Sequence, residues 1–151
     1  MKIKNYNEMG VNKMANEKIG IVVSDFNADI TRLMETLAKQ HVEFLGGAVV
    51  KVIHVPGAFD IPLAAKILVE NKEIDGVVTL GAVIEGDTDH DNIVANNAAR
   101  KIADLSIGYN KPVTLGISGP KMSHADAVKR TEEYAKRSVE ACFKMIRAIK
   151  E

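Results

Sequence analysis

The chain has 151 residues, of which 46% are hydrophobic and 26% charged, a composition typical of a globular protein with one domain-sized core. Its 20 basic and 20 acidic residues give a formal net charge of zero, which argues against a nucleic-acid or membrane-surface partner, since either would favour a basic excess. No apolar run approaches the roughly 18 residues that span a bilayer, and residues 1–17 lack the apolar segment of a signal peptide, so we expect a cytoplasmic protein.

The first predicted elements are a strand and a helix. Residues 19–24 are apolar apart from a glycine and a final serine, which predicts a strand buried on both faces. The apolar spacing that follows predicts a helix over about residues 30–45. Asn27 or Asp29 can cap its start, and Gly46-Gly47 ends it.

The rest of the chain repeats this alternation. The further predicted elements are a strand over residues 49–55, a helix over 61–71, a strand over 77–84, a helix over about 91–109, a strand over 113–118, and a helical stretch from 123 to about 150 with a break near Glu132. No repeat or linker interrupts this order. We therefore assign residues 18–151 to a single domain and residues 1–17 to an N-terminal extension, for which contact with a neighbouring subunit is one role.

The single cysteine, Cys142, cannot form a disulfide within the chain. It falls in a row of apolar residues at helical spacing, which is Ala135, Val139, Cys142, Phe143, Ile146 and Ile149. No histidine stands beside it in the sequence. A packed core thiol is therefore favoured over a catalytic nucleophile.

This order of elements predicts an α/β fold. Its form is a three-layer α/β/α sandwich, a flavodoxin-like four-stranded parallel sheet with right-handed crossovers and helices on both faces. In such sheets ligands bind beyond the carboxyl ends of the strands. Phe26 and Phe59 are two of the four phenylalanines, and both fall where a loop should be polar. Four loops should meet at this edge: residues 25–27, 56–60, 85–90 and 118–121.

His90 is the strongest candidate for chemistry. It ends a stretch that begins as the apolar strand at Leu80 and opens at Gly86 into a polar loop before a helix. An imidazole there can accept and return a proton near neutral pH. The alternative is a solvated loop histidine that caps the helix. For the other histidines, His41, His54 and His124, a structural role is favoured.

The loop before the predicted helix at residue 91 could bind an anion. Backbone N–H groups of residues 86–88 would be free at the helix start, and Thr88 adds a hydroxyl donor. The carboxylates of Asp87 and Asp89 oppose a phosphate there unless they point away. Simple capping of the helix is the alternative for Thr88 and Asp89.

Other loop residues suggest a binding role. Phe26 could stack on a flat heterocycle or plug the core, and Asp60 could bind a polyol or cap the next helix. Arg130 or Arg137 could clamp a phosphate, although each alone is more often a solvated charge. No metal-ligand spacing and no glycine-rich nucleotide motif are present, so we expect neither a metal nor a nucleotide.

Three segments together resemble the lumazine synthase (6,7-dimethyl-8-ribityllumazine synthase) family, and the element order agrees from about Lys18 onward. The most distinctive is Val55-Pro56-Gly57-Ala58-Phe59-Asp60-Ile61-Pro62, which is similar to the ribityl-binding segment of that family. Gly81-Ala82-Val83-Ile84-Glu85-Gly86-Asp87-Thr88-Asp89-His90 is similar to its phosphate and catalytic-histidine loop. Asp25-Phe26-Asn27 resembles its aromatic stacking segment.

The resemblance implies a transferase of riboflavin biosynthesis. Such an enzyme condenses 5-amino-6-(D-ribitylamino)uracil with 3,4-dihydroxy-2-butanone 4-phosphate, releases phosphate and water, and uses no cofactor or metal. It implies proton transfer by His90, stacking of the pyrimidine on Phe26, and phosphate binding by Arg130. The implied substrate-binding positions are Phe26, Asn27, Gly57, Ala58, Phe59, Asp60, Ala82, Val83, Ile84, Asp87, Thr88, Leu115 and Arg130.

The resemblance also implies a homo-oligomer with active sites between neighbouring subunits, either a pentamer or an icosahedral capsid of pentamers. The strand segment around Leu115 and Ile117 would then come from the adjacent subunit. Residues 127–138 contain no long insertion of the kind that blocks capsid closure, which favours a capsid.

Four positions depart from the pattern common in bacterial members and are similar to the archaeal branch. This chain has Glu85 where many bacterial members have an arginine, Asp60 where they have a glutamate, and Leu115 where they have an aromatic residue. It has Ser138 where they often have a lysine, whose role the adjacent Arg137 could take.

Two other functions remain as alternatives. One is the related archaeal riboflavin synthase, which lacks a loop of the kind formed by residues 87–90. The other is a non-catalytic flavin-binding, lumazine-binding or capsid-forming protein, against which His90 and Arg130 argue.

Overall fold

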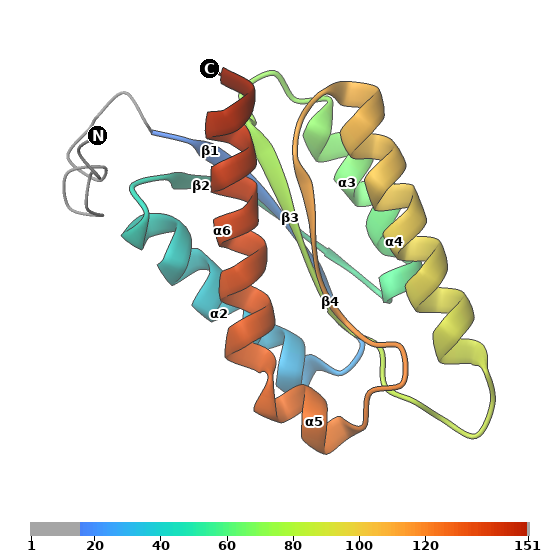
Figure 1. Cartoon of the computed structure of the whole chain (residues 1–151). Helices are drawn as coiled ribbons and strands as arrows, with labels where there is room; N and C mark the ends of the chain where they lie inside the picture. Colours follow the sequence, from blue (N-terminus) through green and yellow to red (C-terminus); the bar gives the residue numbers. More distant parts are fainter. Residues whose placement is uncertain (1–15, 151) are drawn as a thin grey trace.

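The computed structural model describes residues 16–150, which form a parallel sheet and its connecting helices (Figure 1). The strands are β1 (Lys18–Ser24), β2 (Ala48–Val55), β3 (Gly76–Ala82) and β4 (Val113–Ser118). The helices are α2 (Ala28–Phe44), α3 (Ile61–Val69), α4 (His90–Tyr109), α5 (His124–Lys129) and α6 (Thr131–Lys150), and η2 (Ala58–Asp60) is a single 3-10 turn. Except for Asn16 and Glu17, the predicted N-terminal extension lies outside the described residues.

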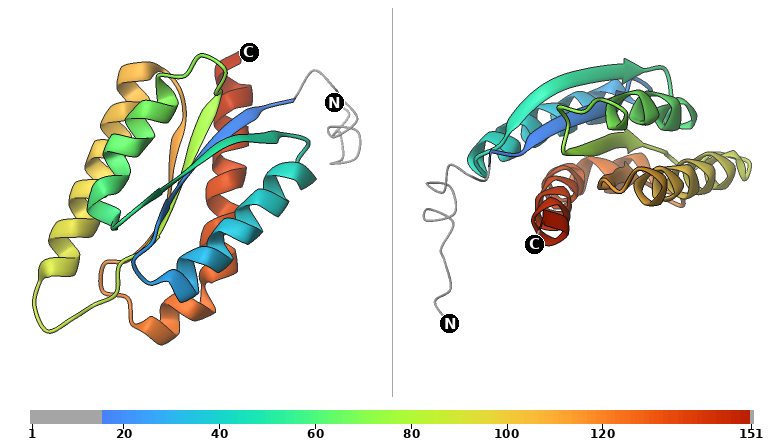
Figure 2. Two further views of the ribbon diagram at one scale, coloured as in Figure 1. Left: turned by 180° about the vertical axis from the view of Figure 1, so that it is seen from behind. Right: turned by 90° about the horizontal axis from the view of Figure 1, so that it is seen from above.

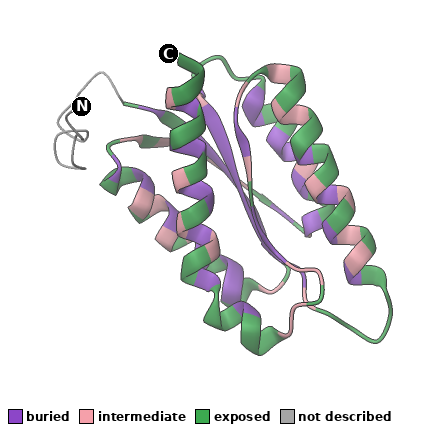
Figure 3. Ribbon diagram, viewed as in Figure 1, coloured by how far each residue is buried: buried purple, intermediate pink, exposed green. Residues whose placement is uncertain are grey.

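The sheet has the order β2-β1-β3-β4, and all three pairings are parallel. Helices α2 and α6 pack on one face and α3 and α4 on the other, as the views from behind and above show (Figure 2). The predicted three-layer, flavodoxin-like α/β fold is confirmed. Of the two central strands, every residue except Lys18 is buried (Figure 3), as expected for strands covered on both faces.

Each face of the sheet has its own apolar core. Met34 of α2 and Phe143 of α6 belong to the first, and Leu68 of α3 and Ala98 of α4 belong to the second. Small residues allow the helices to lie close to the strands. A Cβ added to Gly116 of β4 would lie 2.7 Å from the Ser138 hydroxyl oxygen and 2.5 Å from the Thr79 carbonyl oxygen.

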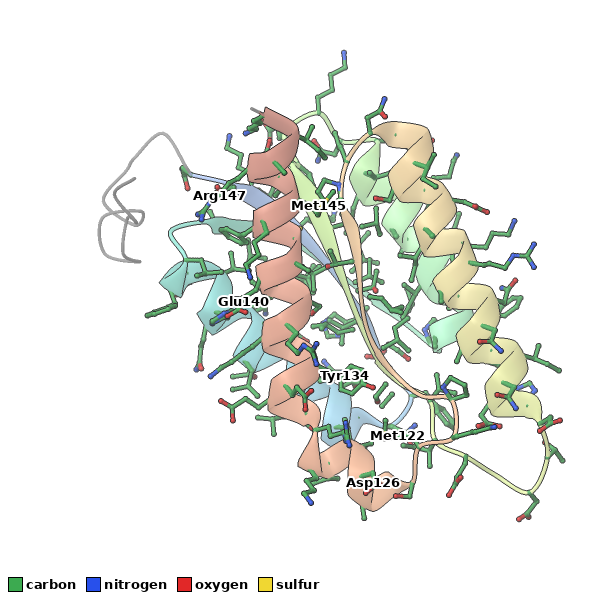
Figure 4. All side chains as sticks on the ribbon, in the orientation of Figure 1. Met122, Asp126, Tyr134, Glu140, Met145 and Arg147 are labelled. Atoms are coloured by element: carbon green, nitrogen blue, oxygen red, sulfur yellow. The ribbon has the colours of Figure 1, made fainter. Side chains whose placement is uncertain are left out.

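Side-chain contacts join α6 to elements far away in the sequence, and two of them reach the start of the domain. Glu140 points toward α2, where its Oε1 lies 2.9 Å from His41 Nε2 (Figure 4). Arg147 donates through Nε to Oε1 of the buried Glu17, at 2.9 Å, directly before β1. The last helix is therefore tied to both the first strand and the first helix of the domain.

The predicted element boundaries differ from the observed ones by a few residues at most, and the final helical stretch is interrupted at Arg130 rather than near Glu132. Ser123 caps α5 as its position indicates, because its hydroxyl oxygen accepts from the Asp126 N–H at 3.1 Å. Asn27 occupies the N-cap position of α2, but neither it nor Asp60 of α3 makes a capping side-chain hydrogen bond. Both side chains instead serve the loops described below.

Gly116 provides a test of close packing between β4 and α6. We expect Gly116→Ala to lower the free energy of unfolding by about 1–3 kcal/mol, because its Cβ has no room. Gly108→Ala is the matched control, since a Cβ at this exposed site in α4 would meet no atom within 4 Å. It should raise the free energy of unfolding by about 0.5–1 kcal/mol through helix propensity. Denaturant titration at one protein concentration measures both, and equal effects would contradict the prediction.

Cys142 provides a test of core burial. The thiol is fully buried, which confirms the predicted core position, and burial raises its pKa to about 12, with the negative charges of Asp75 and Glu17 adding to the rise. We expect a disulfide reagent at about pH 8, near the pKa of a free thiol, to leave the native protein unmodified and to label it rapidly in denaturant. Native labelling that increases between about pH 7 and 9, as for an exposed thiol, would contradict this assignment.

Candidate active site

A pocket of about 450 Å³ lies at the carboxyl ends of the strands, toward the lower edge of Figure 1. Three of the four loops predicted to meet there line it, together with the start of α4. The lining residues are Phe26, Gly57, Ala58, Phe59, Ala82, Val83, Ile84, Gly86, Thr88, His90, Asp91 and Val94. Most residues singled out in the sequence as binding or catalytic thus surround one cavity.

Phe26 is held in place by backbone contacts between the ends of β1 and β2. The Asp25 N–H donates to the Val55 carbonyl at 2.7 Å, and the Phe26 N–H donates to the Pro56 carbonyl at 3.1 Å. Asn27 follows in the left-handed conformation, with φ 64°, and its Nδ2 donates to the Ala82 carbonyl at 2.8 Å. The Phe26 side chain is 70% exposed over the pocket, so the alternative of a core plug is wrong.

The second wall is the turn from Gly57 to Asp60. Asp60 Oδ2 accepts from the Gly57 N–H at 3.1 Å, which closes the turn on itself. Ala58 is buried beneath it, whereas the ring of Phe59 is 60% exposed. The Asp60 carboxylate therefore shapes this wall instead of capping α3, and it is not among the lining residues.

The third wall continues from β3. The Val83 N–H donates to the Ser118 carbonyl and the Glu85 N–H to the Met122 carbonyl, both at 2.8 Å. The loop after β4 thus supports the lining from behind without entering it. Its Gly119 has φ 108°, and a Cβ there would lie 2.3 Å from the Val83 carbonyl oxygen, so only glycine fits.

His90 is the first residue of α4 and is exposed at the pocket. Its backbone N–H donates to Thr88 Oγ1 at 3.4 Å, so Thr88 partly fulfils the predicted capping role. The Asp89 carboxylate accepts from Asn92 Nδ2 at 3.2 Å and caps no backbone N–H. Within residues 16–150 the His90 ring has no hydrogen-bond partner, which leaves both ring nitrogens available to a bound molecule.

Sequence reasoning missed Asp91. This residue lines the pocket and is only 8% exposed, and its Oδ2 accepts from the Lys121 N–H at 3.0 Å. That bond ties the start of α4, and hence His90, to the loop after β4. An acidic residue in the first turn of a helix is usually solvated, so its position beside His90 was the only available signal.

Leu115 and Arg130 lie in a second hollow, of about 340 Å³, between β4 and the start of α6. Leu115 is 48% exposed on the edge strand. Arg137 in the same hollow donates to Glu133 Oε1 at 2.8 Å, whereas the Arg130 guanidinium has no partner within the described residues. Arg130 is therefore the available cation of this hollow.

Three residues predicted to bind substrate lie outside both cavities: the side chains of Asn27, Asp60 and Asp87 line neither cavity.

Other kinds of site find no support among the described residues. No group of three or more histidine, cysteine, aspartate and glutamate side chains in residues 16–150 is arranged to hold a metal ion. In the same range, no helix is long and apolar enough to cross a membrane.

Comparison with known proteins identifies close relatives. The sequence model of the family described as 6,7-dimethyl-8-ribityllumazine synthase matches residues 16–150. Curated proteins with that name include one from Archaeoglobus fulgidus, 56% identical over 138 residues that cover 91% of this chain and 96% of the relative. One from Methanothermobacter thermautotrophicus is 57% identical, with 91% and 99% covered, and one from Methanocaldococcus jannaschii is 56% identical, with 87% and 93% covered. These relatives are archaeal, like the branch that the four departures resemble.

Proposed function

The chain belongs to the 6,7-dimethyl-8-ribityllumazine synthase family, and from this premise we propose how its site works. It condenses 5-amino-6-(D-ribitylamino)uracil with 3,4-dihydroxy-2-butanone 4-phosphate in riboflavin biosynthesis and releases phosphate and water. The observation that carries the proposal is the ring of His90, which has no hydrogen-bond partner within residues 16–150 and lines one pocket with Phe26 and residues 57–59. Such a condensation depends mainly on positioning and proton transfer, which these residues can supply.

The pyrimidine substrate occupies the pocket between the first two walls. Its flat ring stacks on Phe26, whose face is exposed to the cavity. The ribityl chain runs along Ala58 and Phe59, where backbone groups offer hydrogen bonds, and Asp60 contributes by holding this turn through its bond to the Gly57 N–H. Val83 and Ile84 of the third wall cover the other side of the ring.

The phosphate substrate lies at the start of α4. This helix runs from His90 to Tyr109, and the dipole at its N-terminus favours an anion. Residues 86–88 contribute backbone N–H groups and the Thr88 hydroxyl, and Asp87 takes part through its backbone. Because α4 alone leaves the negative charge of a phosphate only partly compensated, a cation is needed, and we assign that role to Arg130.

His90 transfers the protons. When the pyrimidine amine attacks the ketone, the C–N bond forms as the C–O π bond opens, and the imidazole carries one proton from nitrogen to the new alkoxide, which gives a carbinolamine. The imidazole then accepts the second proton of this nitrogen, and the imidazolium delivers it to the hydroxyl, which departs as water while the C=N bond of the imine forms. The same group serves the later loss of phosphate. A single group that both accepts and donates must be partly ionised near neutral pH, as histidine is.

The site is completed by a second copy of the chain. Arg130 and Leu115 lie in a different hollow from His90 and Phe26, so one subunit does not offer all the assigned groups to one substrate pair. Zero net charge and large exposed apolar side chains also favour self-association. These side chains include Leu63 at 70%, Ile93 at 63% and Ile107 at 77% exposed. The proposed assembly is a pentamer or a capsid of pentamers, located in the cytoplasm.

One assay tests the function. Both substrates are incubated with the protein, and the absorbance and fluorescence of the lumazine product are followed. A rate above the uncatalysed background supports the proposal, and a rate equal to background overturns it in favour of a non-catalytic binding or capsid protein. If no lumazine forms from the two substrates, but lumazine supplied in a separate incubation is consumed, the protein is a riboflavin synthase instead.

His90→Ala tests the proton transfer. We expect kcat to fall by about 10²-fold or more, because general acid–base catalysis is lost. The KM values for both substrates should change little, since His90 is not assigned to binding. Steady-state kinetics on the purified oligomer measure both. Full activity in this variant would mean that another group moves the protons.

Arg130→Ala tests the phosphate site. We expect KM for the butanone phosphate to rise about tenfold or more, as for loss of a charge-assisted hydrogen bond, while KM for the pyrimidine stays unchanged. Lys136→Ala is the matched control, because it removes a positive charge from α6, the helix that begins directly after Arg130, where Lys136 pairs with Glu132 at 2.6 Å. An unchanged KM for the phosphate substrate in Arg130→Ala would contradict the assignment.

Mixed oligomers test the sharing of sites between subunits. Subunits carrying His90→Ala and subunits carrying Arg130→Ala are unfolded, mixed and refolded together. If each site takes His90 from one subunit and Arg130 from its neighbour, some mixed sites regain both residues, and activity exceeds that of either variant alone. Activity equal to the average of the two variants would place both residues in one subunit's site.

A further inference from the structure

We propose that His54 is a positioning residue for the wall that carries Phe26, and that its charge sets how firmly this wall is held. It acts through Asp25, which directly precedes Phe26. The consequence for catalysis rests on the proposed function, whereas the effect on the wall itself does not. Neither His54 nor Asp25 lines the pocket, so neither touches the substrate.

Four charged or titratable side chains form what we call the His54 cluster: Asp25, Arg32, Glu35 and His54. His54 Nδ1 lies 3.1 Å from Asp25 Oδ1 and 3.1 Å from Arg32 Nη1. Its other nitrogen, Nε2, lies 3.0 Å from Glu35 Oε1. Arg32 Nη2 also donates to Asp25 Oδ1 at 3.2 Å. Three separate elements thus meet at one imidazole: the end of β1, the end of β2 and the first half of α2.

The cluster braces the pocket from outside. Asp25 follows β1, and its backbone N–H donates to the carbonyl of Val55, the residue after His54. The next backbone bond along the same pair, from Phe26 to Pro56, positions the exposed ring at the cavity. A movement of the Asp25 side chain relative to His54 therefore acts directly on the segment that places Phe26.

The Nε2 atom of His54 carries a hydrogen in either charge state, because the group facing it can only accept. Partial burial opposes ionisation of Glu35. A hydrogen bond from Lys39 and the charges of Lys39 and His54 outweigh this effect, so the pKa of Glu35 lies below its usual range. Glu35 is consequently a carboxylate near neutral pH, and Nε2–H donates to it.

The Nδ1 atom, by contrast, has different partners in the two charge states. In the neutral imidazole Nδ1 is an acceptor for Arg32, and only Arg32 holds the Asp25 side chain. In the imidazolium Nδ1–H donates to Asp25, which forms a charge-assisted hydrogen bond and repels the nearby Arg32 Nη1. Protonation of His54 therefore adds a direct bond between the end of β2 and the residue before Phe26. Histidine exchanges these states between about pH 5 and 8.

The charged groups that face His54 are Asp25 from the β1 end and Arg32 and Glu35 from α2, with Lys39 acting through its 2.7 Å contact to Glu35. Two other histidines could produce a similar pH response and must be separated from it. His90 lines the same pocket, and His124 pairs with Asp29 at the start of α2, at 2.7 Å.

A fluorescent reporter at the wall tests the proposal without substrate. The chain contains no tryptophan, so Phe26→Trp provides a single indole at the pocket. We expect its fluorescence anisotropy in the full-length oligomer to rise as the pH is lowered from about 8 to 5, because the imidazolium holds the wall more firmly. His54→Gln in the same background should remove this rise, and Asp25→Asn, a second variant of nearly unchanged shape, should reduce it.

Control variants assign the titrating group. Phe26→Trp combined with His90→Gln or with His124→Gln should keep the anisotropy change. A change that persists undiminished in His54→Gln overturns the proposal, as does a change that disappears only with His90→Gln. A wild-type chain that fails to form lumazine would overturn the proposed function but leave this experiment interpretable.

Kinetics measure the consequence for catalysis. In the wild-type background, we expect His54→Gln to raise KM for the pyrimidine about three- to tenfold, as for loss of one hydrogen bond. It should leave kcat and KM for the butanone phosphate within about twofold, because His54 touches neither the reacting atoms nor the phosphate site. A general loss of stability would instead lower the amount of active oligomer and hence kcat, and that result would overturn the positioning role.

Discussion

The parallel pairing of β1 with β3 is the constraint on which the rest of the structure depends. It runs from Ile19 opposite Gly76 to Val23 opposite Leu80, with both strands buried between two helical layers. Parallel strands need a crossover between them, so every strand is followed by a loop at the same edge of the sheet. That edge is where Phe26, the turn at Gly57 and the loop to His90 come together.

Three polar side chains at this edge form hydrogen bonds to the backbone of neighbouring segments. Asn27 bonds to Ala82, Asp60 to Gly57 and Asp91 to Lys121, each through one backbone group. These bonds fix the walls of the cavity while leaving Phe26 and His90 exposed. A site built in this way is positioned by its own loops before any substrate binds, which suits a reaction that depends on orientation.

The histidines differ in the partners that surround them. His41 lies against Glu140, His124 against Asp29, and His54 between Asp25 and Glu35. Each of the three histidines has at least one such contact that involves α2, so the imidazoles join this helix to α6, α5 and β2. His90 has no such partner within the described residues, and it is the histidine that lines the pocket. The three histidines with a structural role thus each contact a carboxylate, whereas the histidine proposed to act on substrate contacts none within the described residues.

The sequence by itself determined the strands and the helices and predicted that their loops meet at one edge of the sheet, because these follow from apolar periodicity and local turn residues. It also singled out His90, which lines the pocket at that edge. Only the tertiary structure decided that Leu115 and Arg130 lie in a separate hollow and that Asp91 is buried at the pocket. It also placed His54, for which the sequence indicated only a structural role, beside Asp25, the residue before Phe26. These contacts link residues about 20 to 30 positions apart, as from Arg32 to His54 and from Asp91 to the Lys121 N–H. Periodicity identifies which face of an element is buried, but it carries no information about which distant side chain lies opposite.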